Sequence, residues 1–190
     1  MLERAVQWPH DSLRATWDAG HLYPTGVTEP WTQQVVAALL VASGQRNVLE
    51  LGSYLGLTTV WLALALERLG GGTLTTVELD PARFEHTKQR LYDLRLQKAE
   101  VHFVNRDSLV ALADLPDASV GFAWVDDDHQ AAHVAEELRL LRPKMVPGGL
   151  ITMHDVSGPL GLDTVCRAHG GYVLHFPRLG VAGGLGVIQC

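Results

Sequence analysis

The feature that most constrains this chain is a regular alternation of short apolar runs with amphipathic or buried helices, which begins at Pro30. Strands that alternate with helices predict βαβ units and a mainly parallel sheet. The apolar runs are continuous, as expected when both faces of the sheet are covered. The predicted strands are residues 47–51, 73–79, 100–104, 120–125, 150–153, 172–176 and 185–189, and the predicted helices are 31–42, 57–69, 81 to about 96, 108–112, 129–141 and 163–169.

The last two predicted strands differ from the others in how they are connected. A short glycine-rich segment joins them, which is too short for a crossover, so this pair must be antiparallel. With 190 residues, the chain is long enough for one sizeable domain. We therefore expect a single doubly wound α/β domain with a mainly parallel sheet and an antiparallel last strand. Residues 1–30 are expected to form a helix and a loop that cap the core of residues 31–190.

Charge and composition narrow the class of partner. The formal net charge is −6 and the sequence pI is about 5.8, which disfavours a nucleic-acid substrate. The two cysteines imply no disulfide framework. The longest apolar stretch, residues 60–66, is too short to cross a bilayer, and the charged N-terminus does not resemble a signal peptide. These features predict a cytoplasmic protein with a small-molecule partner, without nucleic acid or membrane.

The turn after the first predicted strand is rich in glycine. Its pattern, from Glu50 through Gly52 to Gly56, is E-x-G-x-x-x-G rather than the G-x-G-x-x-G of a dinucleotide site. Glycines allow close approach of a ligand, and the following helix N-terminus can bind a carboxylate. A carboxylate at Glu50 would repel a pyrophosphate but would suit the cationic end of S-adenosylmethionine. A glycine turn with a purely structural role is the alternative.

Polar side chains also follow the second and third predicted strands. Ligands of such sheets bind at the carboxyl ends of the strands. Glu78 stands where a carboxylate can accept both hydroxyls of a ribose, although it could equally be a solvated strand end, with Asp80 as a helix cap. Asp107 and Ser108 can bond the edge of an adenine, and a second helix cap is the alternative there.

The fourth and fifth predicted strands both end in acidic residues and histidine. Asp126-Asp127-Asp128-His129 follows the fourth, and His154-Asp155 follows the fifth at the same edge of the sheet. Adjacent carboxylates repel one another unless a cation compensates them, and a hard divalent metal ion would do so. The alternatives are an exposed acidic loop and a buried histidine that is satisfied by hydrogen bonds.

A second histidine, His133, lies one helical turn beyond His129. This spacing can form a zinc pair, but no neighbouring motif supports one. We therefore expect that His133 can be replaced at little cost to activity.

These residues, taken together and in order, resemble a known family. The segment V-L-E-L-G-S-Y-L-G-L-T, residues 48–58, is similar to the first motif of class I S-adenosylmethionine-dependent methyltransferases, and especially to the catechol O-methyltransferase-like, metal-dependent group. The resemblance covers roughly residues 26–190. It continues through Val77-Glu78-Leu79, Asp107-Ser108, Val125-Asp126 with His129, Pro147-Gly148-Gly149 and His154-Asp155.

The resemblance implies a Rossmann-like methyltransferase fold with seven strands, a small-molecule substrate and a homodimer. It also implies S-adenosylmethionine and a divalent ion, magnesium or manganese, as cofactors. In the implied cofactor site, Glu50, Gly52, Tyr54, Gly56 and Thr58 surround the methionine part, Glu78 holds the ribose, Leu79 lies under the adenine, Asp107 and Ser108 flank its edge, and Asp126 adjoins the site. Asp126 and Asp155 fall on metal-ligand positions, with His154 as a further ligand, and His129 replaces the lysine that serves as general base in catechol-type members.

The sequence departs from that pattern at two positions. His154-Asp155 stands where the catechol branch has Asp-Asn, and a histidine ligand would widen the choice of metal beyond magnesium. His129 in place of lysine would act as a base with an ionisation roughly between pH 6 and 8.

The predicted function is therefore metal-assisted O-methylation of a small hydroxylated molecule. The signature of amine methylation, Asn/Asp-Pro-Pro-aromatic, is absent after the fourth strand, where V-D-D-D-H stands. The alternative is a binding or regulatory module that holds S-adenosylmethionine without turnover. Asp126, His129 and Asp155 argue against it, because a binder needs none of them. A nicotinamide-dependent oxidoreductase ranks third, given the pattern of the first turn.

Overall fold

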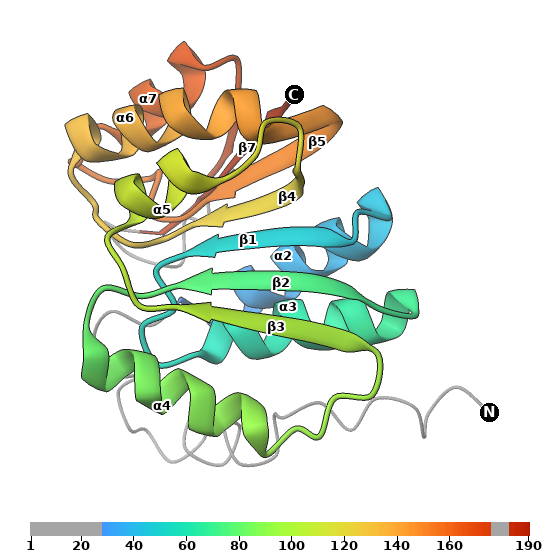
Figure 1. The fold of residues 1–190 in the computed structure, drawn as a ribbon. Helices are drawn as coiled ribbons and strands as arrows, with labels where there is room; N and C mark the ends of the chain where they lie inside the picture. The colour runs from blue at the N-terminus through green and yellow to red at the C-terminus, as the bar shows by residue number, and fades with distance from the viewer. Residues whose placement is uncertain (1–27, 176–182) are drawn as a thin grey trace.

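A computed structural model describes residues 28–175 and 183–190, which form a seven-stranded sheet covered by helices on both faces (Figure 1). The strand order is β3-β2-β1-β4-β5-β7-β6, with β1 to β5 parallel to one another and β7 antiparallel to both β5 and β6. The predicted fold class is thus confirmed. The strands are β1 (Asn47–Leu51), β2 (Gly72–Val77), β3 (Ala99–Val104), β4 (Val120–Val125), β5 (Met145–Met153), β6 (Tyr172–Leu174) and β7 (Leu185–Gln189).

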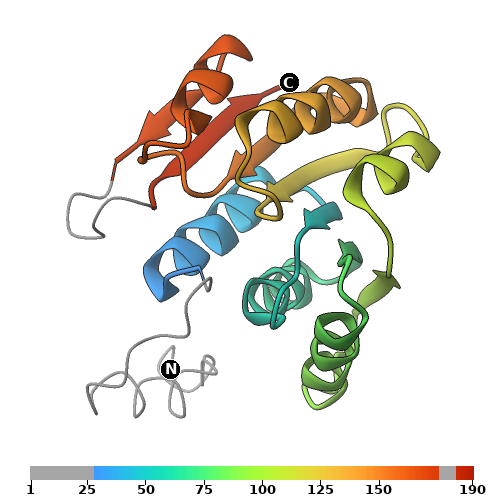
Figure 2. The same ribbon diagram turned by 90° about the vertical axis from the view of Figure 1, so that its left-hand side faces the viewer.

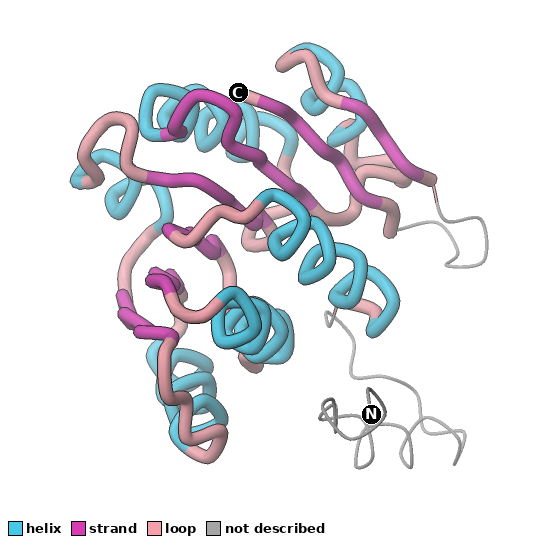
Figure 3. Tube along the Cα trace, turned by 90° about the vertical axis from the view of Figure 1, so that its right-hand side faces the viewer, coloured by secondary structure: helices cyan, strands magenta, loops and turns pink. Residues whose placement is uncertain are grey.

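The helices form a layer on each face of the sheet (Figure 2). On one face lie α2 (Pro30–Ser43), α3 (Leu57–Leu69) and α4 (Pro81–Tyr92), and on the other lie α5 (Ser108–Asp114), α6 (Ala131–Leu141) and α7 (Leu162–Ala168). Figure 3 shows the same two layers from the opposite side. Each layer packs its apolar side chains onto the sheet, which creates two hydrophobic cores. None of the described helices has the length and apolar character needed to span a bilayer.

The order of the strands places a crevice at the middle of one sheet edge. The chain builds outward from β1 through β2 to β3, and then returns to add β4 and β5 on the other side of β1. The strand order therefore reverses between β1 and β4, and ligands of open α/β sheets bind outside the carboxyl ends of strands at such a point. These ends face the viewer in Figure 2.

Several element boundaries differ from the sequence-based expectation, and two of the larger differences have a clear cause. The helix expected to reach about residue 96 ends at Tyr92, because Glu67 of α3 captures the backbone N–H groups of residues 97–99 with one carboxylate oxygen. β5 begins at Met145, five residues before the predicted start. Gly148 and Gly149 form backbone hydrogen bonds with Cys190, and the pairing of β5 with β4 continues across a bulge.

Two further boundaries fall beside predicted site residues. β2 ends at Val77, so Glu78 and Leu79 lie in the connection that follows it. α6 begins at Ala131 rather than at His129, because the Asp128 carboxylate accepts a hydrogen bond from the Gln130 backbone N–H and forms a turn first. Residues 1–27 of the predicted cap and most of the last hairpin turn lie outside the described residues.

Candidate active site

A cavity of about 890 Å³ opens at the carboxyl ends of β1, β2 and β4. Its wall combines the glycine turn after β1, the connection after β2, the start of α5 and the loop that leads into α6. Most of the residues predicted from strand ends meet there. The lining includes Gly52, Tyr54, Glu78, Leu79, Arg83, Asp107, Ser108, Asp126, Asp127, His129 and His133.

The glycine turn is held tightly between the two neighbouring strands. Gly52 donates a backbone hydrogen bond to Val77, and the backbone N–H of Asp126 donates to Leu51. A Cβ atom on Gly52 would lie 2.4 Å from the carbonyl oxygen of Asp126, and the φ of Gly52 is +83°. Tyr54 also adopts a positive φ, 48°, which is uncommon for a non-glycine residue and occurs often at functional sites. Only glycine fits the first position of this turn.

The exchange Gly52→Ala should lower the free energy of unfolding by about 2–4 kcal/mol, since it adds a backbone clash to an unfavourable φ. Gly44→Ala is the matched control, because Gly44 has a φ of +67° but no atom within 4 Å of its Cβ position; it should lose only about 1–2 kcal/mol. Urea denaturation of both variants measures the difference. Equal losses would contradict the close approach of Gly52 to Asp126.

Glu78 is positioned by backbone groups on both sides of the cavity wall. Its side chain is 7% exposed, and its two oxygens accept hydrogen bonds from the backbone N–H groups of Tyr54 (2.8 Å) and Asp80 (2.9 Å). Asn105 donates to the carbonyl oxygens of Glu78 and Leu79, which steadies this connection. The carboxylate therefore joins the glycine turn to the end of β2, with further lone pairs available to a ligand. Asp80, as predicted, caps α4.

Three residues predicted to surround the ligand lie behind the turn and are not among those that line the cavity. Glu50 is fully buried and accepts hydrogen bonds from the hydroxyls of Thr59 and Thr76, both at 2.6 Å. Burial raises the pKa of Glu50 to about 7. Thr58 is buried, and Gly56 caps α3 with a φ of +75°. Contact of these three with a ligand stays a prediction; in the structure they shape the turn.

Asp107 and Ser108 stand at the start of α5, and their contact with an adenine stays a prediction. The Asp107 carboxylate caps α5 by accepting from the backbone N–H of Val110 at 3.2 Å, which confirms the helix cap. Both residues also line the cavity. The Ser108 hydroxyl lies 3.1 Å from Nε2 of His133, so His133 is part of the cavity wall and does not suit the role of a neutral control.

An acid–histidine cluster of Asp126, His129, His154 and Asp155 lies where β4 and β5 end. Nδ1 of His154 lies 3.2 Å from Asp126 and 3.3 Å from Asp155, and Nε2 of His129 lies 2.8 Å from Asp155 and 3.7 Å from Asp126. Nε2 of His154 faces Glu29 at 3.0 Å. The structure thus brings together all four residues predicted for this edge, and it adds Glu29 from the segment before α2.

The charges in this cluster compensate one another. Burial acts to raise the pKa of Asp126, but the charge of His154 and hydrogen bonds from both histidines lower it to about 2. Hydrogen bonds to Asp126 and Asp155 raise the pKa of His129 to about 10. The pKa of His154 is raised well above its usual value despite burial. With the two carboxylates facing one ring nitrogen, the pKa of His129 lies above the range of pH 6 to 8 expected from the sequence, and the ionisation of the cation-bound site stays a prediction.

The donor atoms of this cluster also fit a divalent ion. Two ligands at about 2.0–2.2 Å from one metal ion lie roughly 2.9–3.6 Å apart in octahedral or tetrahedral geometry. The separations of 3.2 and 3.3 Å from His154 to the two carboxylates fall in that range. The donor atoms of Asp126, His129 and His154 lie within 4.8 Å of one another. Asp155 adopts a φ of 54°, so the backbone is strained where its carboxylate enters the cluster.

The three successive carboxylates after β4 do not act as one group. Asp126 belongs to the acid–histidine cluster, whereas Asp127 faces His133 at 3.6 Å and Asp128 forms the turn before α6. The two histidines of the suggested zinc pair therefore lie in different clusters. His133 instead faces Glu137 at 3.4 Å. Sequence reasoning missed Glu137, although its spacing of four residues from His133 on a helix was available as a signal.

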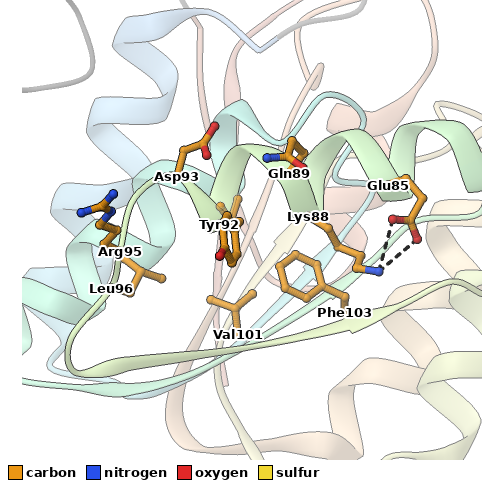
Figure 4. A pocket seen from close by; sticks show the side chains of 10 residues that line it. Glu85, Lys88, Gln89, Tyr92, Asp93, Arg95, Leu96, Val101 and Phe103 are labelled. Atoms are coloured by element: carbon orange, nitrogen blue, oxygen red, sulfur yellow. Dashed lines mark hydrogen bonds and ion pairs between the residues drawn. The ribbon is translucent and has the colours of Figure 1, made fainter.

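A second cavity, of about 810 Å³, lies between α4 and β3 at the edge of the sheet (Figure 4). Its wall includes Tyr92, Val101 and Phe103, and the interaction drawn there is the exposed ion pair between Lys88 and Glu85 at 3.0 Å. This cavity is away from the strand ends that carry the predicted site residues, so we assign the chemistry to the cavity at the carboxyl ends.

Comparison with known proteins gives one family and a common fold. Residues 49–156 match the sequence profile of a family described as "Methyltransferase domain". Proteins of Mycobacterium bovis and Mycobacterium avium that are named as O-methyltransferases are 28% and 27% identical over 131 residues. Each match covers 68% of this chain and 56% of the relative, so the chain spans about half the length of these curated relatives.

Solved structures with a similar fold include two O-methyltransferases. TomG of Streptomyces achromogenes, in complex with S-adenosylmethionine, has a TM-score of 0.67 at 20% identity, covering 93% of this chain and 86% of TomG. The Bacillus cereus enzyme, in complex with S-adenosylhomocysteine, has a TM-score of 0.67 at 21% identity and covers 97% of this chain and 94% of that one.

Proposed function

This chain belongs to the methyltransferase-domain family, and on that premise we propose that it transfers a methyl group from S-adenosylmethionine to a hydroxyl oxygen of a small molecule, with a divalent cation bound at the acid–histidine cluster. The observation that carries this proposal is the meeting of three features in one cavity. These are the glycine turn after β1, the buried carboxylate of Glu78 and the two members of the acid–histidine cluster that line the cavity, Asp126 and His129, which contact His154 and Asp155 behind them. A cofactor and an acceptor bound there would lie side by side.

The cofactor is proposed to lie along the ends of β1, β2 and the start of α5. Gly52 allows a ligand to approach the backbone closely, and Glu78 is positioned to accept hydrogen bonds from the ribose hydroxyls. Leu79 is 66% exposed and lines the cavity, as expected of an apolar surface under an adenine. The ligands bound to TomG and to the Bacillus cereus enzyme support the choice of S-adenosylmethionine.

Methyl transfer from a sulfonium requires alignment of donor and acceptor and removal of one proton from the acceptor hydroxyl. His129 is proposed as the base because its side chain is 39% exposed and lines the cavity, whereas that of His154 is 7% exposed and does not. Asp126 and Asp155 orient the His129 ring through Nε2. The same two carboxylates stabilise the proton on that nitrogen. His129 can therefore act as a base only when Asp126 and Asp155 bind the cation instead.

Asp126, His154 and Asp155 are proposed to hold the divalent cation. When bound, such an ion lowers the pKa of a coordinated hydroxyl. The fit rests on the separation of the donor atoms and on the shared charge of two carboxylates at one edge of the sheet. Thr28 donates a hydrogen bond to the second oxygen of Asp126 at 2.6 Å, which fixes the orientation of this carboxylate and leaves its first oxygen facing the cluster.

Binding of the cofactor gives a direct test of the Glu78 assignment. Calorimetry should detect binding of S-adenosylmethionine or S-adenosylhomocysteine and none of NAD. Glu78→Ala should weaken binding by about 1.5–3 kcal/mol, because it removes charged hydrogen bonds to the ribose. The exposed Glu100 of β3 provides the control variant Glu100→Ala, for which unchanged affinity is expected. Unchanged affinity in Glu78→Ala would remove the ribose assignment.

The acceptor class is tested by an assay with labelled methyl groups. S-adenosylmethionine is supplied with vicinal diols, catechols and hydroxylated sugars, each with and without a divalent metal ion, and labelled product is measured. The competing function is a module that binds the cofactor without turnover. It predicts the same calorimetric binding, but no labelled product with any acceptor.

A further inference from the structure

A second group of potential metal ligands lies beside the acid–histidine cluster but shares no residue with it. It consists of Asp127, His133 and Glu137, whose donor atoms all lie within 4.8 Å of one another. Nε2 of His133 is 3.6 Å from Asp127 and 3.4 Å from Glu137. His133 and Glu137 are four residues apart on α6 and therefore share one face of the helix. Both contacts converge on the same ring nitrogen.

Glu137 is the unusual member of this group. It is 0% exposed, and neither carboxylate oxygen makes a hydrogen bond of good geometry to a described residue, although Asp127, Ser108 and His133 lie near it. One oxygen of Asp127, Oδ1, is likewise buried without such a hydrogen bond. Buried polar groups in folded proteins are normally paired, because an unpaired one loses its hydration without compensation. The two carboxyl groups therefore share His133 as a common neighbour, but they lack the close hydrogen bonds that would compensate their burial.

We propose that Asp127, His133 and Glu137 bind a divalent transition-metal ion, with Zn²⁺ as the best match. Zinc accepts both imidazole nitrogen and carboxylate oxygen as donors, whereas magnesium prefers oxygen donors and retains several waters. The separations of 3.4 and 3.6 Å fall in the range of roughly 2.9–3.6 Å estimated for two ligands of one such ion.

The position of the site indicates what the ion would do. Asp127 belongs to the connection after β4, and His133 and Glu137 belong to α6, so one ion would join the strand end to the helix. Asp127 and His133 also line the cavity, next to Ser108. The ion would therefore rigidify the wall of the cavity on the side of α5, beside the acid–histidine cluster. This role does not depend on the proposed methyl transfer.

The test measures binding of metal alone, without cofactor or acceptor. The parent protein carries Asp155→Asn, which weakens metal binding at the acid–histidine cluster, and it is first treated with a chelator. Co²⁺ and Zn²⁺ are then titrated into it in separate experiments. The parent should bind the ion and gain thermal stability from it. Adding Glu137→Gln should weaken this affinity by about 100-fold or more, since a ligand rather than an outer-shell partner is lost. Adding Glu136→Gln, the exposed neighbour that pairs with Arg139, should leave the affinity unchanged.

The thermal midpoint in chelator shows whether Glu137→Gln folds, and His133→Gln provides a second ligand variant if it does not. Loss of affinity in both variants, with folding intact, supports the site. The proposal is overturned if the Asp155→Asn parent binds neither ion, or if both ligand variants bind as the parent does; His133 then forms ordinary ion pairs with the two carboxylates. Because no turnover is measured, failure of the proposed O-methylation would leave these outcomes unaffected.

Discussion

Removal of divalent cations should lower the rate of methyl transfer by roughly 10²–10³-fold, and Mg²⁺ or Mn²⁺ should restore it. Metal-ion stabilisation of developing charge is worth several kcal/mol, and each 1.36 kcal/mol corresponds to a factor of ten in rate. The measurement compares turnover of an acceptor found in the labelled-methyl assay before and after treatment with a chelator. Full activity in chelator would assign Asp126 and Asp155 to substrate binding instead.

The variant Asp155→Asn tests whether the required metal ion binds at the acid–histidine cluster. Asp155 contacts both histidines, at 2.8 Å and 3.3 Å, so its loss should raise the metal concentration needed for half-maximal rate. Asp163 of α7, which lies outside the cavity, supplies the matched control Asp163→Asn. If both variants need the same metal concentration for half-maximal rate, the metal ion that supports the rate does not bind at this cluster.

The variant His129→Ala should lower turnover by about 10²–10⁴-fold while the affinity for S-adenosylmethionine stays close to that of the wild type. Loss of a general base typically lowers the rate by this factor, and His129 lines the cavity beside Asp155 rather than in contact with Glu78, the residue proposed to hold the cofactor. Turnover is measured at saturating acceptor and metal, and affinity is measured by calorimetry. The split between rate and affinity distinguishes a base from a residue that only shapes the cofactor site.

His102→Ala is the control for this variant, because His102 is half exposed on β3 and pairs with Glu100 outside the cavity. It should keep the turnover of the wild type. His133 is unsuitable, since it contacts Ser108 and faces Glu137 within the cavity wall. If His129→Ala keeps wild-type turnover, His129 serves only to orient Asp126 and Asp155.

The arrangement of strands and helices was predictable because its signals are local. Apolar runs of strand length alternate with helical patterns, and turn residues such as Gly70 separate them. The rule that ligands bind at the carboxyl ends of parallel strands then brought Gly52, Glu78 and Asp126 to one edge, where the structure places them. These steps required no knowledge of which side chains touch.

Contacts between distant segments were beyond such reasoning. Glu29 and His154 are 125 positions apart and meet at 3.0 Å, and no local pattern links them. Burial could not be predicted either: Glu50 lies behind the turn and accepts hydrogen bonds from Thr59 and Thr76, while its contact with a ligand stays a prediction. Since pKa values depend on such contacts, the high pKa of His129 could not be anticipated from a residue type that usually titrates near neutrality.

The central claim, methyl transfer to oxygen, is tested most directly by following the labelled methyl group of S-adenosylmethionine into product. Purified protein is incubated with the labelled cofactor, Mg²⁺ or Mn²⁺ and the hydroxylated acceptors, and the product is analysed by mass spectrometry and nuclear magnetic resonance. We predict one mole of O-methyl product for each mole of S-adenosylhomocysteine formed. We predict no O-methyl product when the chain carries Glu78→Ala together with His129→Ala. Cofactor binding without transfer to any hydroxyl, or transfer only to nitrogen or carbon, would contradict the central claim.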